Sequence, residues 1–429
     1  MRSVFFSILM AFCLPFCHGQ SSDSNYLRVR TFLDGSGSMS TEKTQYYDGL
    51  GRPTLAVTNG IGLSSNLFNY TLQQYDSCGR ASISWLPKPS SDTFLGSDCS
   101  VTTYDALDRP VFVTTPGEDM NGRGKRIEYI TNSSYSVKWY NADNMAMDRY
   151  YPACSLNGER TTDEDGHVVE VFKDLHGNLV LERRYIDASS FTDTYYVYNV
   201  LFQLCYVLSP MCTSASTEML NAYAYQYTYD SKGRMATKKL PGCLTCEYHY
   251  DTADRLISSK DGNGIIHFYL YDSLNRLAVQ GTCSSMLSND LPASPVQFVN
   301  SGGICNTGYI LPYGYTLSSP VLEIANYYDT YGFLSLSPVS ESFQSFSLPP
   351  LPTSSAMSLQ TGTMSLTSSG DRLCSVLYYD SRGNVTCRCE AYPSDVLHKT
   401  ETAYSFTDKP LSIVTSLLRY DTAYVVSEI

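Results

Sequence analysis

The feature that most limits how this chain can fold is a short motif that recurs along it. Tyr-Asp is followed by two variable residues, then by Gly, Asp or Asn, and then by Arg. Six full copies and one shortened copy supply the candidate residues of the sequence, which are Tyr47, Asp48, Gly51, Arg52, Tyr75, Asp76, Gly79, Arg80, Tyr104, Asp105, Arg109, Tyr229, Asp230, Gly233, Arg234, Tyr250, Asp251, Arg255, Tyr271, Asp272, Arg276, Tyr379, Asp380 and Gly383. A weaker copy begins at Tyr328-Asp329. Because Tyr229, Tyr250 and Tyr271 follow one another at intervals of 21 residues, the copies are predicted to be tandem structural units.

Each copy has the residues of a β-hairpin. The alternating stretch Tyr225-Gln-Tyr-Thr-Tyr229 places its aromatic side chains on one face of a strand. Asp230 can then accept backbone N–H bonds in an Asx turn, and Gly233 suits the positive φ that a tight turn needs. Asp and Asn, which replace this glycine in other copies, also tolerate that conformation. The chain is predicted to return as an antiparallel strand after Arg234.

The composition agrees with a protein made of strands and turns. Tyr is abundant at 36 residues, whereas charged residues make up only 17% of the chain. A chain of 429 residues is too long for one ordinary core, and one hairpin of this length cannot bury its apolar face alone. We therefore predict an all-β fold of tandem antiparallel hairpins, preceded by a small β-rich N-terminal domain. In this fold the motif Tyr and Arg residues pack as a ladder and do not form a catalytic or binding set.

The array resembles the Rhs/YD-repeat proteins, whose repeats form strand-rich spirals or shells. Tyr223–Gly281 carries the resemblance most clearly, and Tyr327–Asp408 carries it more loosely. The segment from Tyr26 to Asn141 is similar to the uncharacterised N-terminal domain that precedes such repeats in some secreted bacterial members, through YYDGLGRP, YDALDRPVFVTTPG and Trp139-Tyr-Asn. In the family, such shells can enclose a C-terminal toxin. This chain lacks the Gly- and Tyr-rich core motif that closes the repeats, so a truncated or degenerate member, or the opening part of a shell, is expected.

The predicted domain organisation follows from this resemblance and from breaks in the rhythm. Residues 1–19 are a signal peptide, residues 20–141 are the β-rich N-terminal domain, and residues 142–429 are the repeat region. Irregular insertions are predicted near 287–319, which is rich in Ser, Pro, Gly and Asn, and near 338–369, a Ser/Thr/Pro-rich run expected as a long loop or a poorly ordered insertion.

The N-terminus indicates export. Arg2 is followed by the apolar run Val4–Phe16 and by small residues before a predicted cleavage after Gly19. A lipid anchor on Cys17 is the alternative, but Pro15-Phe16 lacks the small residues that such processing prefers. No later run approaches the roughly 20 apolar residues of a membrane span. The chain is expected to be secreted, periplasmic or at the cell surface.

One stretch suggests a metal site and is rejected on its context. TFLDGSGSMS contains Asp34, Ser36 and Ser38, which match the start of the metal-binding loop of a von Willebrand A domain. Such a domain continues with a helix, whereas Thr41–Tyr47 is predicted to be a strand that leads into the Tyr47-Asp48 turn. Gly35 to Gly37 are therefore predicted to be turn residues of a hairpin.

Other candidates for chemistry are weak. Removing Cys13 and Cys17 with the signal peptide leaves 12 of the 14 cysteines, whose pairing cannot be deduced. Cys243 and Cys246 have redox-motif spacing but no helix start to lower a thiol pKa, so a local disulfide or free thiols are expected. His167 and His176 lie on predicted hairpin turns, where solvent exposure is expected. We predict no catalytic residue, no metal site and no cofactor.

The functional expectation is an exported, non-catalytic scaffold or shell segment. The net charge of −12 argues against nucleic acid as a partner. The expected partners are a cell-surface protein or a glycan, and other segments of an Rhs-type shell. Two alternatives stay open: a glycan-binding module that uses exposed Tyr with Trp85 and Trp139, and a glycosidase, which would need two converging carboxylates.

Overall fold

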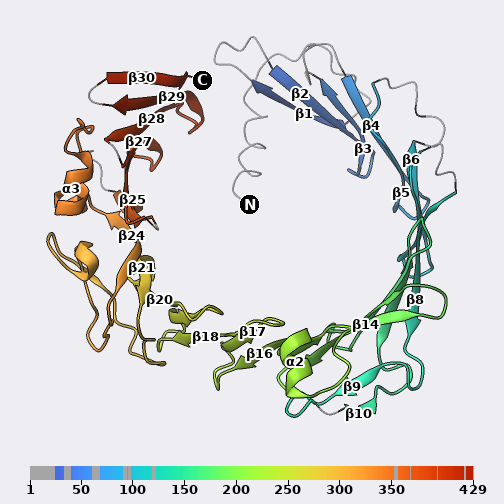
Figure 1. The fold of residues 1–429 in the computed structure, drawn as a ribbon. Helices are drawn as coiled ribbons and strands as arrows, with labels where there is room; N and C mark the ends of the chain where they lie inside the picture. Colours follow the sequence, from blue (N-terminus) through green and yellow to red (C-terminus); the bar gives the residue numbers. More distant parts are fainter. Residues whose placement is uncertain are drawn as a thin grey trace. The chain divides into compact units, whose positions relative to one another are not determined.

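The computed structural model describes residues 25–32, 40–59, 68–89, 94, 98–117, 122–145, 147–351, 356–367, 369–393, 395–419 and 422–428. Over these residues the regular secondary structure is almost entirely strand, which confirms the predicted all-β hairpin fold (Figure 1). Two compact units are present: Met1–Glu128 with Arg160–Val168 is unit 1, and Tyr129–Glu159 with Val169–Ile429 is unit 2. The predicted signal peptide, residues 1–19, and the stretch holding Asp34, Ser36 and Ser38 lie outside the described residues.

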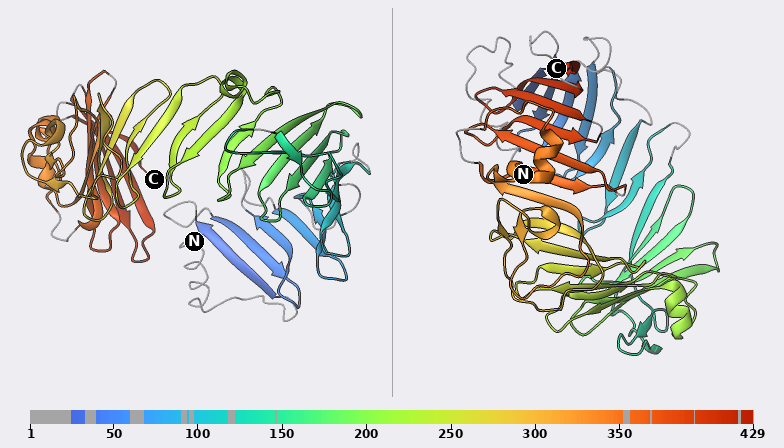
Figure 2. Two further views of the ribbon diagram at one scale, coloured as in Figure 1. Left: turned by 90° about the horizontal axis from the view of Figure 1, so that it is seen from below. Right: turned by 60° about the vertical axis from the view of Figure 1, so that its left-hand side comes forward.

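Unit 1 is built from short strands that pair antiparallel with their neighbours in sequence. Figure 2 shows β1 to β4 lying side by side as one row. The predicted strand over Thr41–Tyr47 is confirmed, since β2 spans it. The strands are β1 (Asn25–Phe32), β2 (Ser40–Tyr47), β3 (Pro53–Asn59), β4 (Phe68–Tyr75), β5 (Ala81–Trp85), β6 (Cys99–Tyr104), β7 (Pro110–Thr114), and β8 (Gly124–Thr131) and β11 (Asn157–Thr162), which have residues in both units.

Unit 2 is also built from antiparallel strands that pair with their neighbours in sequence, and it contains more of them. From β12 to β21, and again from β24 to β30, each strand pairs antiparallel with the next, and β21 pairs with β24. The elements are β9 (Lys138–Tyr140), β10 (Met147–Tyr150), β12 (Val168–Lys173), β13 (Leu179–Tyr185), β14 (Phe191–Tyr198), β15 (Leu204–Leu208), α2 (Thr217–Tyr223), β16 (Ala224–Tyr229), β17 (Met235–Lys239), β18 (Thr245–Tyr250), β19 (Leu256–Lys260), β20 (Ile266–Tyr271), β21 (Leu277–Cys283), β22 (Gln297–Phe298), η4 (Ile304–Asn306), β23 (Tyr309–Ile310), β24 (Val321–Asp329), η5 (Gly332–Ser335), α3 (Ser337–Phe343), β25 (Ala356–Leu366), β26 (Arg372–Tyr379), β27 (Val385–Tyr392), β28 (Val396–Tyr404), β29 (Pro410–Arg419) and β30 (Thr422–Glu428).

The motif turns share one backbone geometry. In the hairpin β16–β17, Gly233 donates its N–H to the Asp230 carbonyl at 3.0 Å, and Asp230 donates to the Arg234 carbonyl at 2.9 Å. Gly233 has a φ of 81°, and the strand register shifts by one residue next to Tyr229. This combination of a tight turn, a positive φ and a bulge is a common three-residue hairpin loop.

The main core of unit 2 forms where irregular segments cover the sheet. The segment 284–320 supplies Leu287, Val296, Tyr309 and Tyr315, all of which are buried against sheet residues such as Phe268. The stretch from η5 through α3 adds Phe333, Leu336, Val339 and Phe343 to the same core, and Figure 1 shows α3 beside β24 and β25. The hairpin sheet thus gains a second layer here, because a single sheet layer cannot bury its own apolar face.

A separate core lies earlier in unit 2. The β9–β10 region contributes Val137, Met145 and Leu156, which pack with buried residues of β12 to β15. Between the two cores, β17 and β18 contain no fully buried residue. The sheet is therefore two-layered only where an additional segment lies over it.

The structure corrects two expectations about the insertions. Residues 338–369 are not a long loop, because they contain most of α3 and the whole of β25, which pairs with β24 and β26. The copy at Tyr328-Asp329 does not close a tight hairpin, since η5 and α3 separate β24 from β25. Residues 287–319 contain the short elements β22, η4 and β23, and they cover the main core.

None of the helices among the described residues is long and apolar enough to cross a lipid bilayer.

Candidate functional site

The aspartate of each motif organises its own turn. The Asp230 carboxylate accepts the backbone N–H groups of Lys232 and Arg234 through Oδ1, both at 2.9 Å. Its Oδ2 accepts the Arg234 Nε at 2.7 Å. The same three contacts recur in the five other full copies, at Asp48, Asp76, Asp105, Asp251 and Asp272. The sequence predicted the Asx turn but did not predict this ion pair with the motif arginine.

The motif arginine reaches forward to the next hairpin along the sheet. The Arg234 guanidinium lies over the ring of Tyr250, with 4.8 Å from its carbon to the ring centroid, and Arg255 lies over Tyr271 at 4.9 Å. Arg52 over Tyr75, Arg80 over Tyr104 and Arg276 over Tyr328 repeat the contact at 4.4, 4.7 and 4.2 Å. Each pair is a cation–π contact between neighbouring hairpins.

The motif tyrosine reaches back in the other direction. The Tyr250 hydroxyl donates to the backbone carbonyl of Met235, which directly follows Arg234, at 2.9 Å. Tyr271 donates to Leu256 at 2.8 Å in the same way. Equivalent hydrogen bonds start from Tyr75, Tyr104, Tyr229, Tyr328 and Tyr404. One motif Asp, the Arg of the same motif and the Tyr of the next hairpin form a recurring set of contacts. We call this set the clasp.

The fourth residue of the motif turn is Gly, Asp or Asn, and the Asp and Asn side chains bind an arginine of the preceding hairpin. Arg234 donates to the Asp254 carboxylate at 2.8 Å, and Arg255 donates to the Asn275 amide oxygen at 2.9 Å. Gly79 takes this position with a φ of 85°, which glycine adopts without strain, and an added Cβ there would meet only the flexible end of Arg52. Asp and Asn at this position therefore extend the clasp, and all three residue types tolerate its positive φ.

Several hairpins have the same turn geometry as the motif copies although their sequences lack the Tyr-Asp motif. Asp163–His167 and Asp174–Asn178 have the same carboxylate contacts, with His or Asn in place of Arg. These two were predicted as turns, as was Asp261–Ile265. Sequence reasoning missed Asn199–Gln203, in which Phe202 adopts a φ of 59°, and Ser405–Lys409, because neither carries Tyr-Asp or a turn glycine.

The structure also shows the surroundings of the cysteine and histidine candidates. Cys243 and Cys246 keep free thiols. The exposed His167 lies 2.9 Å from the Asp163 carboxylate, and His176 packs against the Phe202 ring. Within the part of the chain that the structure describes, no three His, Cys, Asp or Glu side chains gather as a metal site requires.

Hydrogen bonding lowers the pKa of the three motif carboxyls in unit 1 below the usual range. The backbone N–H of Arg52 is the main cause that lowers the pKa of Asp48, and those of Arg80 and Arg109 act likewise on Asp76 and Asp105. The ion pair with the same arginine lowers each pKa further. The ionised carboxylate is therefore the form that stabilises the turn.

These shifts predict that unit 1 loses stability in acid. A lowered pKa in the folded state stabilises the fold above the unfolded pKa of about 3.9, and this contribution disappears as the pH falls through the folded value. We expect the urea midpoint of unit 1 to fall as the pH drops below about 4. Urea titrations over this range, compared with an Asp76→Asn/Asp105→Asn variant, would measure it. An unchanged pH dependence in that variant would contradict the assignment.

The tyrosine hydroxyl of the clasp can be tested alone. Tyr250→Phe keeps the ring under Arg234 and removes only the hydrogen bond to Met235. We expect a loss of about 0.5–1.5 kcal/mol in the free energy of unfolding, measured by urea titration. Tyr313→Phe is the control, because that side chain is 94% exposed, and it should cost nothing measurable. Equal effects of the two changes would rule out a contribution from the hydroxyl.

Comparison with known proteins gives a short family match and distant structural similarity. Residues 27–101 match a family described as a domain of unknown function, DUF6443. No curated protein matches the chain. Among solved structures it is similar to TcdB2-TccC3 without the hypervariable C-terminal region (12% identity, TM-score 0.46, 90% of this chain and 19% of that chain) and to the Photorhabdus luminescens Tc holotoxin pore (12% identity, TM-score 0.44, 91% and 22%). The chain spans about a fifth of the length of these structures.

Proposed function

We propose that this chain is an exported, non-catalytic scaffold segment of the Rhs/YD-repeat type, whose hairpins form part of a larger protein shell or a surface for interaction. The observation that carries the proposal is the clasp. The functional groups that recur most along the sequence are directed at neighbouring hairpins. The Asp230 carboxylate binds the backbone of its own turn and the Arg234 side chain. Arg234 also contacts Tyr250, Asp254 and Asp290. Contacts of this kind stabilise the packing of successive hairpins, which is what a scaffold requires.

The distribution of the core supports the same proposal. The sheet continues through β17 and β18 with side chains that are only partly buried. Tyr225 and Leu244, which flank these strands, are exposed at 39% and 69%. A sheet that leaves both apolar and aromatic side chains accessible between two covered regions offers surface to other protein segments.

The proposal can be tested by isolating the native protein after cross-linking. We expect cross-links from the lysines of β17, Lys238 and Lys239, to another β-repeat segment, and an N-terminus at Gln20 in the exported protein. Mass spectrometry of the cross-linked material and N-terminal sequencing would measure both. Recovery of the chain as an isolated monomer with hydrolytic activity on a panel of glycosides would contradict the scaffold and favour the glycosidase.

A further inference from the structure

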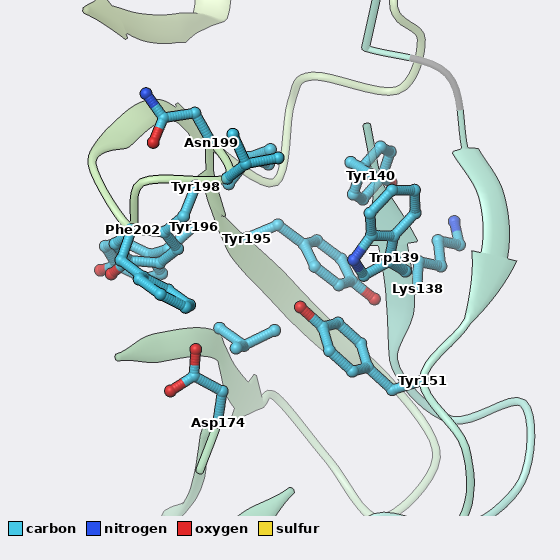
Figure 3. Close-up of a pocket in the computed structure, with 13 residues that line it drawn as sticks. Lys138, Trp139, Tyr140, Tyr151, Asp174, Tyr195, Tyr196, Tyr198, Asn199 and Phe202 are labelled. Carbon is cyan, nitrogen blue, oxygen red and sulfur yellow. The ribbon is translucent and has the colours of Figure 1, made fainter. Parts of the chain in front are cut away.

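Unit 2 carries a cleft that is lined mainly by aromatic side chains and that takes no part in the clasp (Figure 3). Its volume is about 180 Å³. It lies between β9 and β14, with the turns at Asp174 and Asn199 at its rim. The rings of Tyr151 and Tyr195 enter from opposite sides, and Trp139 stands next to them.

A second cavity of about 410 Å³ adjoins the first. The two share Trp139, Tyr151 and Asp174 as lining residues. The second cavity adds Arg149 and His176. Tyr151 and Trp139 therefore stand between two compartments of one groove, whose volumes together fall within the range of about 300–1,000 Å³ that is common for ligand sites.

The walls of this groove are held in place before any ligand arrives. Tyr195 is buried and packs edge-on against Tyr140, with 5.2 Å between ring centroids. The Arg149 guanidinium lies 4.4 Å from the centroid of the Trp139 ring. His176 and Phe202 pack together at 4.1 Å and join the two rim turns. A ligand that enters would order few side chains, which lowers the entropic cost of binding.

Polar groups stand among these rings. The Tyr195 hydroxyl donates to the Asp193 carboxylate at 3.2 Å and accepts the backbone N–H of Lys138, which fixes the position of its ring in the wall. Burial raises the pKa of Tyr151 to about 12, so its hydroxyl stays protonated at neutral pH and can donate or accept. The Asp174 carboxylate lines both cavities; its Oδ1 accepts two backbone N–H groups of its own turn, and its Oδ2 accepts the Asn178 amide and keeps one further lone pair.

We propose that this groove binds a neutral oligosaccharide. A pyranose ring has an apolar face of C–H groups, which can pack on Trp139 or Tyr151, and a rim of hydroxyls that both donate and accept hydrogen bonds. Aromatic side chains with a polar tip suit this mixture of contacts. Two adjoining compartments accommodate more than one sugar unit.

The polar groups favour a saccharide over the other usual occupant of an aromatic groove. Proline-rich segments also dock between aromatic rings. They have few N–H or O–H donors, however, because proline lacks a backbone N–H. They would leave the Asp174 carboxylate facing an apolar ligand, which is unfavourable. A sugar hydroxyl can donate to that carboxylate.

Isothermal titration calorimetry on the full chain tests the proposal with cellohexaose, maltohexaose and chitohexaose, and with a decaproline peptide. We expect at least one hexaose to bind, and Trp139→Ala to weaken that binding at least about tenfold. Tyr151→Phe removes a single hydroxyl with little risk to folding and should weaken binding at least about threefold. Trp85→Phe, which changes the other of the two tryptophans, and Tyr313→Ala should leave the affinity unchanged.

Three results would overturn the saccharide site. The first is the absence of binding by all three hexaoses at concentrations of about 10 mM. The second is hexaose binding that survives both Trp139→Ala and Tyr151→Phe in variants whose circular dichroism matches the unmodified protein. The third is binding of decaproline in place of every hexaose. None of these results bears on the cross-links expected for the scaffold, so the two proposals stand or fall separately.

Discussion

Replacing Asp251 by alanine is expected to lower the free energy of unfolding of unit 2 by about 3–5 kcal/mol, because it leaves a buried charge without its partner. The Asp251 side chain is 0% exposed, and its Oδ2 lies 2.6 Å from the Nε of Arg255, which is itself 13% exposed. The carboxylate also accepts the backbone N–H groups of Ala253 and Arg255. The substitution therefore removes an ion pair and two turn contacts at the most buried copy of the motif. Urea unfolding followed by circular dichroism would measure the loss.

Asp380→Ala is the matched control in the same unit. Asp380 accepts the same two N–H groups, from Arg382 and Asn384, and its Oδ2 accepts the neutral Asn384 amide. Its ion pair is long and exposed, because Oδ2 lies 3.9 Å from the Nε of Arg382 and the two side chains are 23% and 42% exposed. The change there should shift the urea midpoint much less. Equal shifts for Asp251→Ala and Asp380→Ala would mean that the buried ion pair adds nothing to the turn contacts.

The hairpins were predictable because their signals are local. Tyr229, Asp230 and Gly233 lie within five residues, and each contributes a backbone preference that depends only on its immediate neighbours. The register follows, since a turn of fixed length fixes the pairing of the strands on either side. The same locality explains why Asn199–Gln203 was missed: Phe202 adopts a positive φ that its residue type does not suggest.

The contacts between hairpins were not predictable from one copy of the motif. Arg234 meets Tyr250 and Asp254, which lie 16 and 20 residues further along, only because the next hairpin packs at a set distance across the sheet. The prediction that Tyr and Arg form a ladder did not include these partners. Their hydrogen bonds depend on the twist and spacing of the sheet, which no short stretch of sequence records.

The covering segments were the least predictable part of the fold. Residues near 287–319 are rich in Ser, Pro, Gly and Asn, and those near 338–369 are rich in Ser, Thr and Pro, so their composition predicts irregular insertions or loops. The few apolar residues within them, such as Val296 and Val339, are nevertheless buried in the core. Their contribution depends on contacts with strands that are distant in sequence. Composition alone therefore does not reveal how much such segments contribute to the hydrophobic core.

The core that these segments complete is expected to depend on Tyr327. This side chain on β24 is 2% exposed and stacks against Phe333 of η5, with ring centroids 4.4 Å apart and planes inclined by 5°. Its other face lies parallel to Tyr309 of the covering segment, at 5.8 Å. The tyrosine thus contacts both segments that give the sheet its second layer. Truncation would leave a cavity at their junction.

We expect Tyr327→Ala to lower the free energy of unfolding by about 3–5 kcal/mol, as the removal of other buried aromatic rings does. Tyr327→Phe keeps the stack and loses only the hydroxyl, which donates to the Thr307 carbonyl at 3.1 Å, so about 1–3 kcal/mol should be lost as that buried carbonyl is left without its donor. Urea titration would measure both, and hydrogen exchange should show faster exchange at the β24–β25 amides in Tyr327→Ala. If Tyr327→Ala costs no more than Tyr327→Phe, the covering segments do not depend on this ring. Their packing would then have to come from the separate contacts of Leu287, Val296 and Val339 with the sheet.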